Sequence, residues 1–321
     1  MRGRSASTGP TVAAAFRRTV ALLGAARLHY GHGTHDARDE AAFLILHLLG
    51  LAPQPLARQA NSHLSAAQAK RLQTLVERRI RTRLPAAYLV HEAWLGAHRF
   101  YVDRRVIVPR SFIAELLRAR LDPWLRHPVR RALDLCTGSG CLAILTAHAF
   151  PRARIDASDD ARSALAVARR NVDLHAVQRR VRLVQGDLFA GLGRRRYDLI
   201  VCNPPYVKLA SMRRLPPEYR HEPGRALAGG VDGLALVHRI LREAPGHLTP
   251  QGVLVCEIGH NRTALERAYP QTPFVWPETS AGPGHVFVLA RGAFPLRQAA
   301  SACRAPARLR RARRSTHPRA R

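Results

Sequence analysis

The sequence predicts a doubly wound α/β domain that follows a small helical domain, and three observations lead to this prediction. Short apolar runs alternate with helical stretches from residue 131 onward, which is typical of parallel strands covered by helices on both faces. A glycine-rich turn follows the first apolar run and opens a helix. The part before residue 93 has helical apolar spacing without such alternation.

Length and composition limit the classes to which the protein can belong. The chain has 321 residues, enough for two domains and a large core. Its formal net charge of +30 and its 46% hydrophobic residues exclude an acidic or wholly disordered chain. No apolar run is long enough to span a membrane, so no membrane partner is expected. A chain this basic is expected to attract polyanions such as ribosomal RNA, although an Arg-rich surface can also reflect composition alone.

Three helical stretches predict an N-terminal domain over residues 11–92. The first begins at Val12, the second follows a predicted N-cap at Asp36, and the third follows a predicted N-cap at Ser65. Residues 1–10 precede these stretches and are expected to form a disordered tail.

A linker and the α/β domain follow. Alternating apolar and polar residues predict a β-hairpin linker over 93–109. The α/β domain is expected over 110–291, and residues 292–321, which contain many Arg and no Asp or Glu, predict a basic disordered tail. The expected strands are Ala132–Leu135, Arg154–Ser158, Val181–Gln185, Leu199–Cys202, Val253–Ile258 and Val286–Leu289, and the expected helices are 141–149, 160–175, 231–244 and 261–269.

The five cysteines do not suggest a disulfide framework, because their number is odd and the chain is long. Several lie in or beside apolar strands, so we expect small buried thiols in a reducing compartment and a cytoplasmic protein. No two cysteines have the Cys-x-x-Cys spacing of a zinc site, so no metal site is expected.

The glycine-rich turn Asp134-Leu-Cys-Thr-Gly-Ser-Gly140 suggests a ligand site. Its glycines allow a ligand to approach the backbone, and the following helix N-terminus adds donors. Asp159 and Asp187 follow the second and third strands, so their carboxylates converge on the same crevice. Asp159 can accept both hydroxyls of a ribose, although it or Asp160 could instead cap the next helix. This arrangement suits a nucleoside-containing cofactor.

The most informative motif is Asn203-Pro-Pro-Tyr206, which follows the fourth strand. Two prolines fix φ and remove two backbone donors. The side-chain oxygen of Asn203 and the carbonyl of Pro204 can then point outward and accept the two N–H bonds of a planar amino group, against which Tyr206 offers a flat face. A simple turn would explain the prolines but not their position beside the crevice.

Together these motifs resemble the class I S-adenosylmethionine-dependent methyltransferases that methylate amino groups. The resemblance implies a Rossmann-like, seven-stranded methyltransferase domain with S-adenosyl-L-methionine as cofactor. It implies that the 134–140 loop contacts the methionine part, Asp159 the ribose, and Asp187 with Leu188 the adenine. The implied cofactor-binding residues are Asp134, Cys136, Thr137, Gly138, Ser139, Gly140, Asp159, Asp187, Leu188 and Asn203. The implied catalytic residues are Asn203, Pro204 and Tyr206, and Pro205 joins them in binding the substrate.

Further segments narrow the resemblance to the glutamine-N5 methyltransferases that modify translation proteins. They are Val108-Pro-Arg-Ser111, the helical N-terminal domain and Cys256-Glu-Ile-Gly259. Tyr30-Gly-His-Gly-Thr34 and Glu218-Tyr-Arg-His-Glu-Pro223 are similar to the PrmB-type branch, whose substrate is the third protein of the large ribosomal subunit. This implies that the N-terminal domain recognises the substrate. One departure is Asp160-Ala-Arg, where this group usually has Ile-Ser-Pro.

Other functions compete with this one. The release-factor branch typically has Pro-Arg-Pro-Glu-Thr and a glycine at the position of Cys136. A methyltransferase acting on adenine N6 or guanine N2 of RNA or DNA would need the same Asn-Pro-Pro-Tyr geometry, but the sequence shows no zinc module and no aromatic RNA platform. A ribosome-assembly factor on an inactive methyltransferase fold is the non-enzymatic alternative. His221 with Glu222 could either dock the substrate or stabilise a loop.

Overall fold

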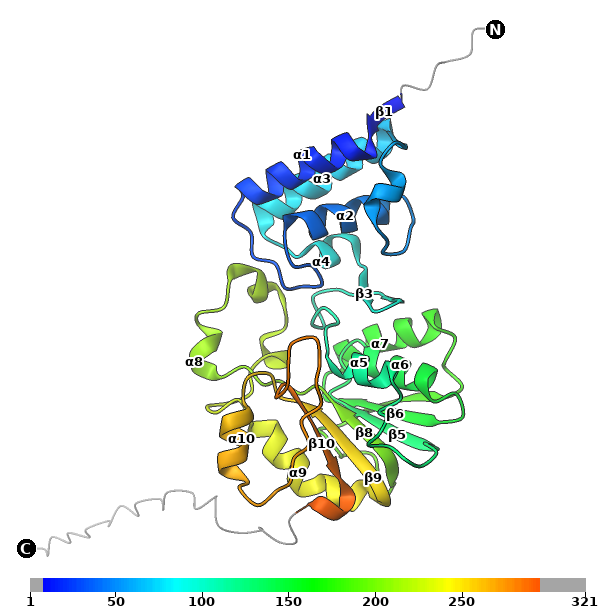
Figure 1. Cartoon of the computed structure of the whole chain (residues 1–321), viewed down its shortest axis with the longest axis vertical. Coiled ribbons are helices and arrows are strands. Elements are labelled where there is room, and N and C mark those ends of the chain that lie inside the picture. Colours follow the sequence, from blue (N-terminus) through cyan, green and yellow to red (C-terminus); the bar gives the residue numbers. More distant parts are fainter. Residues whose placement is uncertain (1–7, 295–321) are drawn as a thin grey trace, which may run out of the picture.

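The computed structural model describes residues 8–294, and it consists of a small helical domain and a larger α/β domain joined by a short hairpin (Figure 1). The helical domain contains α1 (Val12–Ala25), α2 (Ala37–Leu48), α3 (Ala66–Thr82) and α4 (Ala86–Val90). Buried aliphatic side chains hold these helices together, among them Leu23, Leu44 and Leu72. The three predicted helices are confirmed.

Side-chain caps start α2 and α3 as predicted. The Asp36 carboxylate accepts hydrogen bonds from the backbone N–H groups of Arg38 and Asp39, at 2.7 and 2.9 Å. The Ser65 hydroxyl accepts from the N–H of Gln68, whose side chain accepts in return from the N–H of Ser65. Each cap satisfies N–H groups that the helix itself leaves without a partner.

The N-terminal tail is shorter than the sequence suggests. Residues Thr8–Thr11 form β1, which pairs antiparallel with β2 (His63–Ser65) ahead of α3. The backbone of residues 8–10 is therefore ordered by a partner some fifty residues away, which local composition does not reveal. Residues 1–7 lie outside the described residues.

The α/β domain is built on a six-stranded sheet with the order β10-β9-β8-β5-β6-β7, in which only β10 is antiparallel to its neighbour. Apolar side chains cover both faces: α5 and α6 pack on one face, and α9 and α10 on the other. The strands are β5 (Arg131–Leu135), β6 (Arg154–Asp159), β7 (Val181–Gln185), β8 (Tyr197–Cys202), β9 (Leu248–Glu257) and β10 (Val286–Ala290). The helices are α5 (Ile113–Arg118), α6 (Cys141–Ala149), α7 (Arg162–Leu174), α9 (Ala235–His247) and α10 (Arg262–Ala268).

The expected seventh strand is reduced to a single antiparallel bridge between Val275 and Val288, beside β10. Pro273 and Pro277 flank this segment. Proline has no N–H to donate, so the pairing cannot extend into a regular ladder at this edge.

The linker begins with a hairpin of β3 (Ala93–Leu95) and β4 (His98–Phe100), which is shorter than the hairpin predicted over 93–109. A long segment after the Asn-Pro-Pro-Tyr motif contains α8 (Leu209–Met212) and the short 3-10 helices η2 (Pro217–His221) and η3 (Gly224–Ala226). Phe294 is buried in the core, so residues 292–294 belong to the domain rather than to the expected tail, whose residues 295–321 lie outside the described residues. Within residues 8–294 no helix is both long and apolar enough to cross a bilayer.

Candidate active site

The strand register brings the predicted site residues to one edge of the sheet. Leu135 of β5 pairs with Ser158 of β6 on one side and with Cys202 of β8 on the other. The glycine-rich turn, Asp159 and Asn203 therefore leave the sheet side by side. Because β5, β6 and β8 run parallel, this edge is formed by their carboxyl ends, where doubly wound sheets bind ligands.

The glycine-rich turn folds tightly against β6. Cys136, Gly138 and Gly140 all have positive φ, at 57°, 52° and 81°. A Cβ on Gly140 would lie only 3.2 Å from the Cβ of Ala168, so α7 packs where a side chain would otherwise be. The N–H of Thr137 donates to the carbonyl of Ser158 at 3.0 Å. The turn thus folds its backbone against β6 and α7, and only Cys136 and Gly138 of residues 136–140 stay partly exposed.

Asp134 lies beneath this turn and is almost completely buried. One carboxylate oxygen, Oδ2, accepts from the hydroxyl of Thr137 at 2.6 Å and from the N–H of Ala143 at 2.9 Å. The other oxygen, Oδ1, is buried and has no hydrogen-bond partner among the described residues. Burial raises the pKa of Asp134 to about 7. An unpartnered buried carboxylate oxygen is costly, and a cationic ligand group beside it would remove that cost.

Asp159 caps the start of α7 and also bonds the glycine-rich turn, while its contact with a ribose stays a prediction. Its Oδ2 accepts from the N–H of Gly138 in the turn, and its Oδ1 accepts from the N–H of Ala161 at the start of α7, both at 2.9 Å. Each oxygen keeps lone pairs for a ligand hydroxyl. Burial raises the pKa of this carboxyl. Asp160 does not share the site, because its exposed carboxylate is paired with Arg225.

The third strand end is arranged differently from the other two. Leu188 is buried with a φ of 53°, and its carbonyl accepts from the Ser158 hydroxyl at 3.2 Å, which places it beside the turn. Asp187 is exposed, and both its oxygens accept from Arg239 of α9, at 3.0 and 2.9 Å. Contact of Asp187 and Leu188 with adenine stays a prediction.

The side chain of Asn203 has a defined orientation. Its Nδ2 donates to the backbone carbonyl of Arg110 at 3.2 Å. Within residues 8–294, no donor bonds its Oδ1, and no N–H bonds the carbonyl of Pro204. Two acceptors next to each other are therefore left for an outside donor, as the motif predicts.

Close packing and hydrogen bonds fix the position of Tyr206. Its ring packs on the backbone of Gly259, where a Cβ would lie 2.7 Å from the ring, and a Cβ on Gly229 would lie 2.6 Å from the Tyr206 Cα. The Tyr206 carbonyl accepts from Nδ2 of Asn261 at 2.8 Å, and its hydroxyl donates to Glu257 at 3.2 Å. Burial and the nearby Glu257 raise the pKa of Tyr206, so the hydroxyl stays protonated.

A cavity of about 160 Å³ lies beside Asn203, Pro204 and Tyr206. This is the volume of roughly five water molecules at ~30 Å³ each, which suits one amino-acid side chain. The other residues around it are mostly apolar or aromatic: Ile107, Arg110, Val207, Leu215, Tyr219, Ala226 and Leu227.

Comparison with known proteins identifies the family. The Methyltransferase small domain family matches residues 114–214, and the PrmC N-terminal domain family matches residues 21–90. A ribosomal protein uL3 glutamine methyltransferase of Bordetella pertussis is 54% identical over 277 residues, which cover 86% of this chain and 93% of that protein. One of Neisseria meningitidis serogroup A is 50% identical over 293 residues, covering 91% and 96%.

The chain belongs to the ribosomal protein uL3 glutamine methyltransferase family. The solved structures agree on the fold. The hMettl16 catalytic domain, crystallised with a MAT2A 3'UTR hairpin, matches with a TM-score of 0.50 and 15% identity, over 78% of this chain and 91% of that one. The predicted class I methyltransferase fold with a helical N-terminal region is confirmed.

Sequence reasoning missed the side chains that support the Asn-Pro-Pro-Tyr motif in this member of the uL3 glutamine methyltransferase family. Glu257 is buried and accepts from the Ser111 hydroxyl at 2.7 Å, from the Phe112 N–H at 2.9 Å and from Tyr206. Glu222 is buried and accepts two bonds from the Arg110 guanidinium, at 2.6 and 2.7 Å. The signal was present, because these residues lie in segments that carried the resemblance, but their roles appear only in three dimensions.

The family-typical segment around Glu218 joins the two domains. The buried Glu218 carboxylate lies 2.7 Å from Arg83 and 3.6 Å from Arg79, both on the α3 side, and accepts from the N–H of His29 at 2.9 Å. His221 bonds the carbonyl of Thr82. These contacts support the loop-stabilising role of His221 and Glu222 over substrate docking.

The expectation of buried thiols holds for two of the four cysteines in the described part of the chain, because Cys136 and Cys141 are only partly buried. Cys136, Cys141, Cys202 and Cys256 are all unpaired, and Cys202 and Cys256 are buried on adjacent strands beneath the site. Burial raises the pKa of the Cys202 thiol well above its usual range.

Proposed function

We propose that this chain transfers a methyl group from S-adenosyl-L-methionine to the side-chain amide nitrogen, N5, of a glutamine in ribosomal protein uL3. The observation that carries this proposal is the pair of unpartnered acceptors, Asn203 Oδ1 and the Pro204 carbonyl, beside a cavity sized for one side chain. Relatives named uL3 glutamine methyltransferases, 50–54% identical over most of the chain, support the choice of substrate.

The residues at the strand ends fit this cofactor. The carboxylate of Asp134 lies buried beneath the turn with one oxygen unpartnered, and its charge would favour the positively charged methionine part above it. The lone pairs of Asp159 suit the ribose hydroxyls. Leu188 and Asp187 would border the adenine. The bound cofactor supplies a methyl group activated by a positively charged sulfur. Gly138 leaves open space beside the turn, where a Cβ would meet nothing within 4 Å, and Gly140 lets α7 pack closely against the turn.

The chain contributes mainly positioning. An amide nitrogen is a poor nucleophile because its lone pair is delocalised. Asn203 Oδ1 and the Pro204 carbonyl would accept its two N–H bonds and hold the nitrogen in line with the reacting methyl, while Tyr206 forms a flat wall. The amide proton, which becomes acidic as the C–N bond forms, leaves to one of these acceptors or to water, so no general base is needed. Orientation of this kind contributes up to about 7–11 kcal/mol, and aligned dipoles add to it.

The other parts of the chain would bring the substrate to this site. The helical domain over 11–92 would recognise the ribosomal protein, because Glu218 and His221 bond it to the segment that borders the cavity. The basic residues after 294 would contact ribosomal RNA. Such partners place the reaction in the cytoplasm.

The proposal is tested by incubating the protein with labelled S-adenosyl-L-methionine and, in separate reactions, ribosomal proteins, ribosomal RNA and release factors from a strain that lacks this activity, followed by mass spectrometry. The label is expected on one glutamine of uL3. Label on ribosomal RNA instead would establish the base-methylating alternative, label on a release factor would establish the other branch, and no transfer to any of them would favour an assembly factor.

A further inference from the structure

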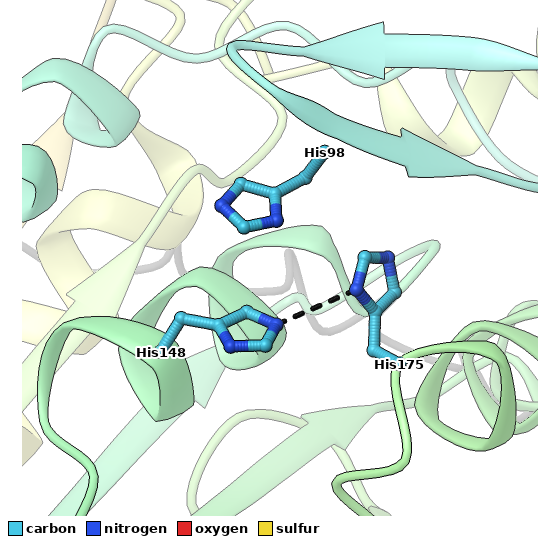
Figure 2. A group of neighbouring side chains, drawn as sticks. All are labelled: His98, His148 and His175. Carbon is cyan, nitrogen blue, oxygen red and sulfur yellow. Dashed lines mark hydrogen bonds between the residues drawn. The ribbon is translucent and has the colours of Figure 1, made fainter. Parts of the chain in front are cut away.

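Three histidines from different elements lie close together on the side of the α/β domain (Figure 2). His98 begins β4 of the linker hairpin, His148 lies in the last turn of α6, and His175 directly follows α7. One ring nitrogen from each lies within 4.8 Å of those of the other two. His98 and His175 are half-buried and His148 is exposed, so the cluster is open to solvent on one side.

The spacing of two of these nitrogens already suits a metal. Nε2 of His148 and Nδ1 of His175 are 3.4 Å apart. Two nitrogens bound tetrahedrally to Zn²⁺ at ~2.0–2.1 Å each are separated by about 3.4 Å. His98 is further from this arrangement, because its ring is nearly parallel to that of His148, at 12° with centroids 4.8 Å apart. Its ring must turn about its side-chain bonds to aim a nitrogen at the same point.

His175 makes the kind of hydrogen bond that orients many metal-binding histidines. Its second ring nitrogen, Nε2, lies 2.8 Å from the carbonyl of Arg99 and donates to it. This bond leaves Nδ1 unprotonated and aimed at the cluster, as an outer hydrogen bond does for many metal-bound imidazoles.

The groups around the histidine cluster partly favour and partly oppose a bound cation. His148 and His175 lie at the C-terminal ends of α6 and α7, where the helix dipoles favour positive charge. Two cationic groups oppose this: Arg180, which donates to the Ala147 carbonyl at 2.6 Å, and Arg99 next to His98.

We propose that His98, His148 and His175 bind a divalent transition-metal ion, with Zn²⁺ the best match and a water in the fourth position. Imidazole nitrogens select Zn²⁺, Cu²⁺ or Ni²⁺ over Mg²⁺ and Ca²⁺, which prefer oxygen. Three histidines and one open position form a site that zinc commonly occupies. Cysteine spacing, from which no metal site is expected, says nothing about these three histidines.

The metal would act as a clamp rather than in the chemistry. It would tie the hairpin that leads from the helical domain to two helices of the α/β domain. His148 lies about 12 Å along α6 from Gly140, since a helix rises ~1.5 Å per residue. The inference is therefore independent of methyl transfer and goes beyond it.

The test uses the full-length chain without an affinity tag, titrated with ZnCl₂ by calorimetry and analysed for bound metal after dialysis. One Zn²⁺ per chain is expected, together with a higher melting temperature, and no binding of Mg²⁺. The single variants His148→Asn and His175→Asn should each weaken Zn²⁺ binding by roughly ten-fold or more, because removing even a hydrogen-bond partner of a metal ligand costs that much. Replacing Zn²⁺ by Co²⁺ should give the strong visible absorption of a four-coordinate site.

Matched controls separate this cluster from the other histidines. His127→Asn and His260→Asn change exposed histidines outside it and should leave Zn²⁺ affinity unchanged. Circular dichroism confirms folding of every variant, and His148, being exposed, is the least demanding to replace. The proposal is overturned if the wild-type chain binds no Zn²⁺ at micromolar concentrations. It is also overturned if a folded variant lacking all three histidines binds Zn²⁺ as well as the wild type.

Discussion

Replacing Asn203 by alanine removes the side chain that the proposed mechanism needs most. The substitution deletes one of two acceptors for the substrate amide, and it leaves the glycine-rich turn, Asp134 and Asp159 in place. Losing one preorganised polar group at a reacting centre costs ~10²–10³-fold in turnover, or ~2.7–4 kcal/mol. We therefore expect kcat to fall at least ~10²-fold while the affinity for S-adenosyl-L-methionine changes little.

The effect on stability should be much smaller. The only side-chain hydrogen bond of Asn203 among the described residues is the 3.2 Å bond to the Arg110 carbonyl. Such a bond contributes ~1 kcal/mol net, and leaving its acceptor unpaired adds ~1 kcal/mol or more. A variant that remains folded but is nearly inactive would separate catalysis from folding.

The assay measures methyl transfer from labelled cofactor to purified uL3, with cofactor affinity by calorimetry and stability by urea titration. Asn203→Asp keeps an acceptor oxygen but replaces the amide NH2 by a second oxygen, which cannot donate to the Arg110 carbonyl, so it should also lose turnover through misorientation. Asn61→Ala, the same change at an exposed position of the helical domain, is the control. Near-normal kcat in Asn203→Ala would refute the assignment of this residue to the reacting amide.

Three further predictions follow from the ionisable groups around the site. Cofactor affinity should fall as the pH drops from 8 to 6, because burial raises the pKa of Asp134 to about 7 and its protonation removes the negative charge opposite the cationic cofactor. Calorimetry should show a weaker pH dependence in Asp134→Asn, and tighter binding at pH 6 would contradict the prediction. Glu222→Leu should lower the free energy of unfolding by about 3 kcal/mol, because Arg110 loses its bidentate partner. In urea titrations the double variant Arg110→Met/Glu222→Leu should be more stable than Glu222→Leu alone, yet remain inactive. Glu218→Ala should raise KM for uL3 in steady-state assays without changing cofactor affinity, because Glu218 bonds the helical domain; an equal loss of cofactor binding would point to a general disturbance of the fold.

Short-range patterns in the sequence determined most of the secondary structure and the position of the site. The apolar runs that predict β5, β6, β7 and β8 correspond to observed strands to within two residues. In β5 and β8 nearly every residue is buried, and such a strand must be apolar along its length. Asp36 and Ser65 predict helix starts, since a cap acts on N–H groups two or three residues away. The motif at 203–206 carries its own geometry, because proline constrains the backbone locally.

Only the tertiary structure decided how distant residues complete the site. Glu257 and Glu222 meet Tyr206 and Arg110 across 51 and 112 positions of the chain, and no local pattern shows which partner either glutamate meets. The same holds for the pairing of β1 with β2. The segment around Val275 shows the reverse case, in which local sequence overrides the fold family: the two flanking prolines prevent the seventh strand that the family resemblance implies.

The histidine cluster illustrates the physical reason most directly. His98, His148 and His175 are 50 and 27 positions apart, and each would be an unremarked polar residue at the end of its own element. Sequence periodicity reports which side of a helix or strand is buried, and this depends on neighbours within a few residues. Which element ends meet depends on how the helices pack on the sheet and on the path of the hairpin, and these follow from the packing of the whole chain.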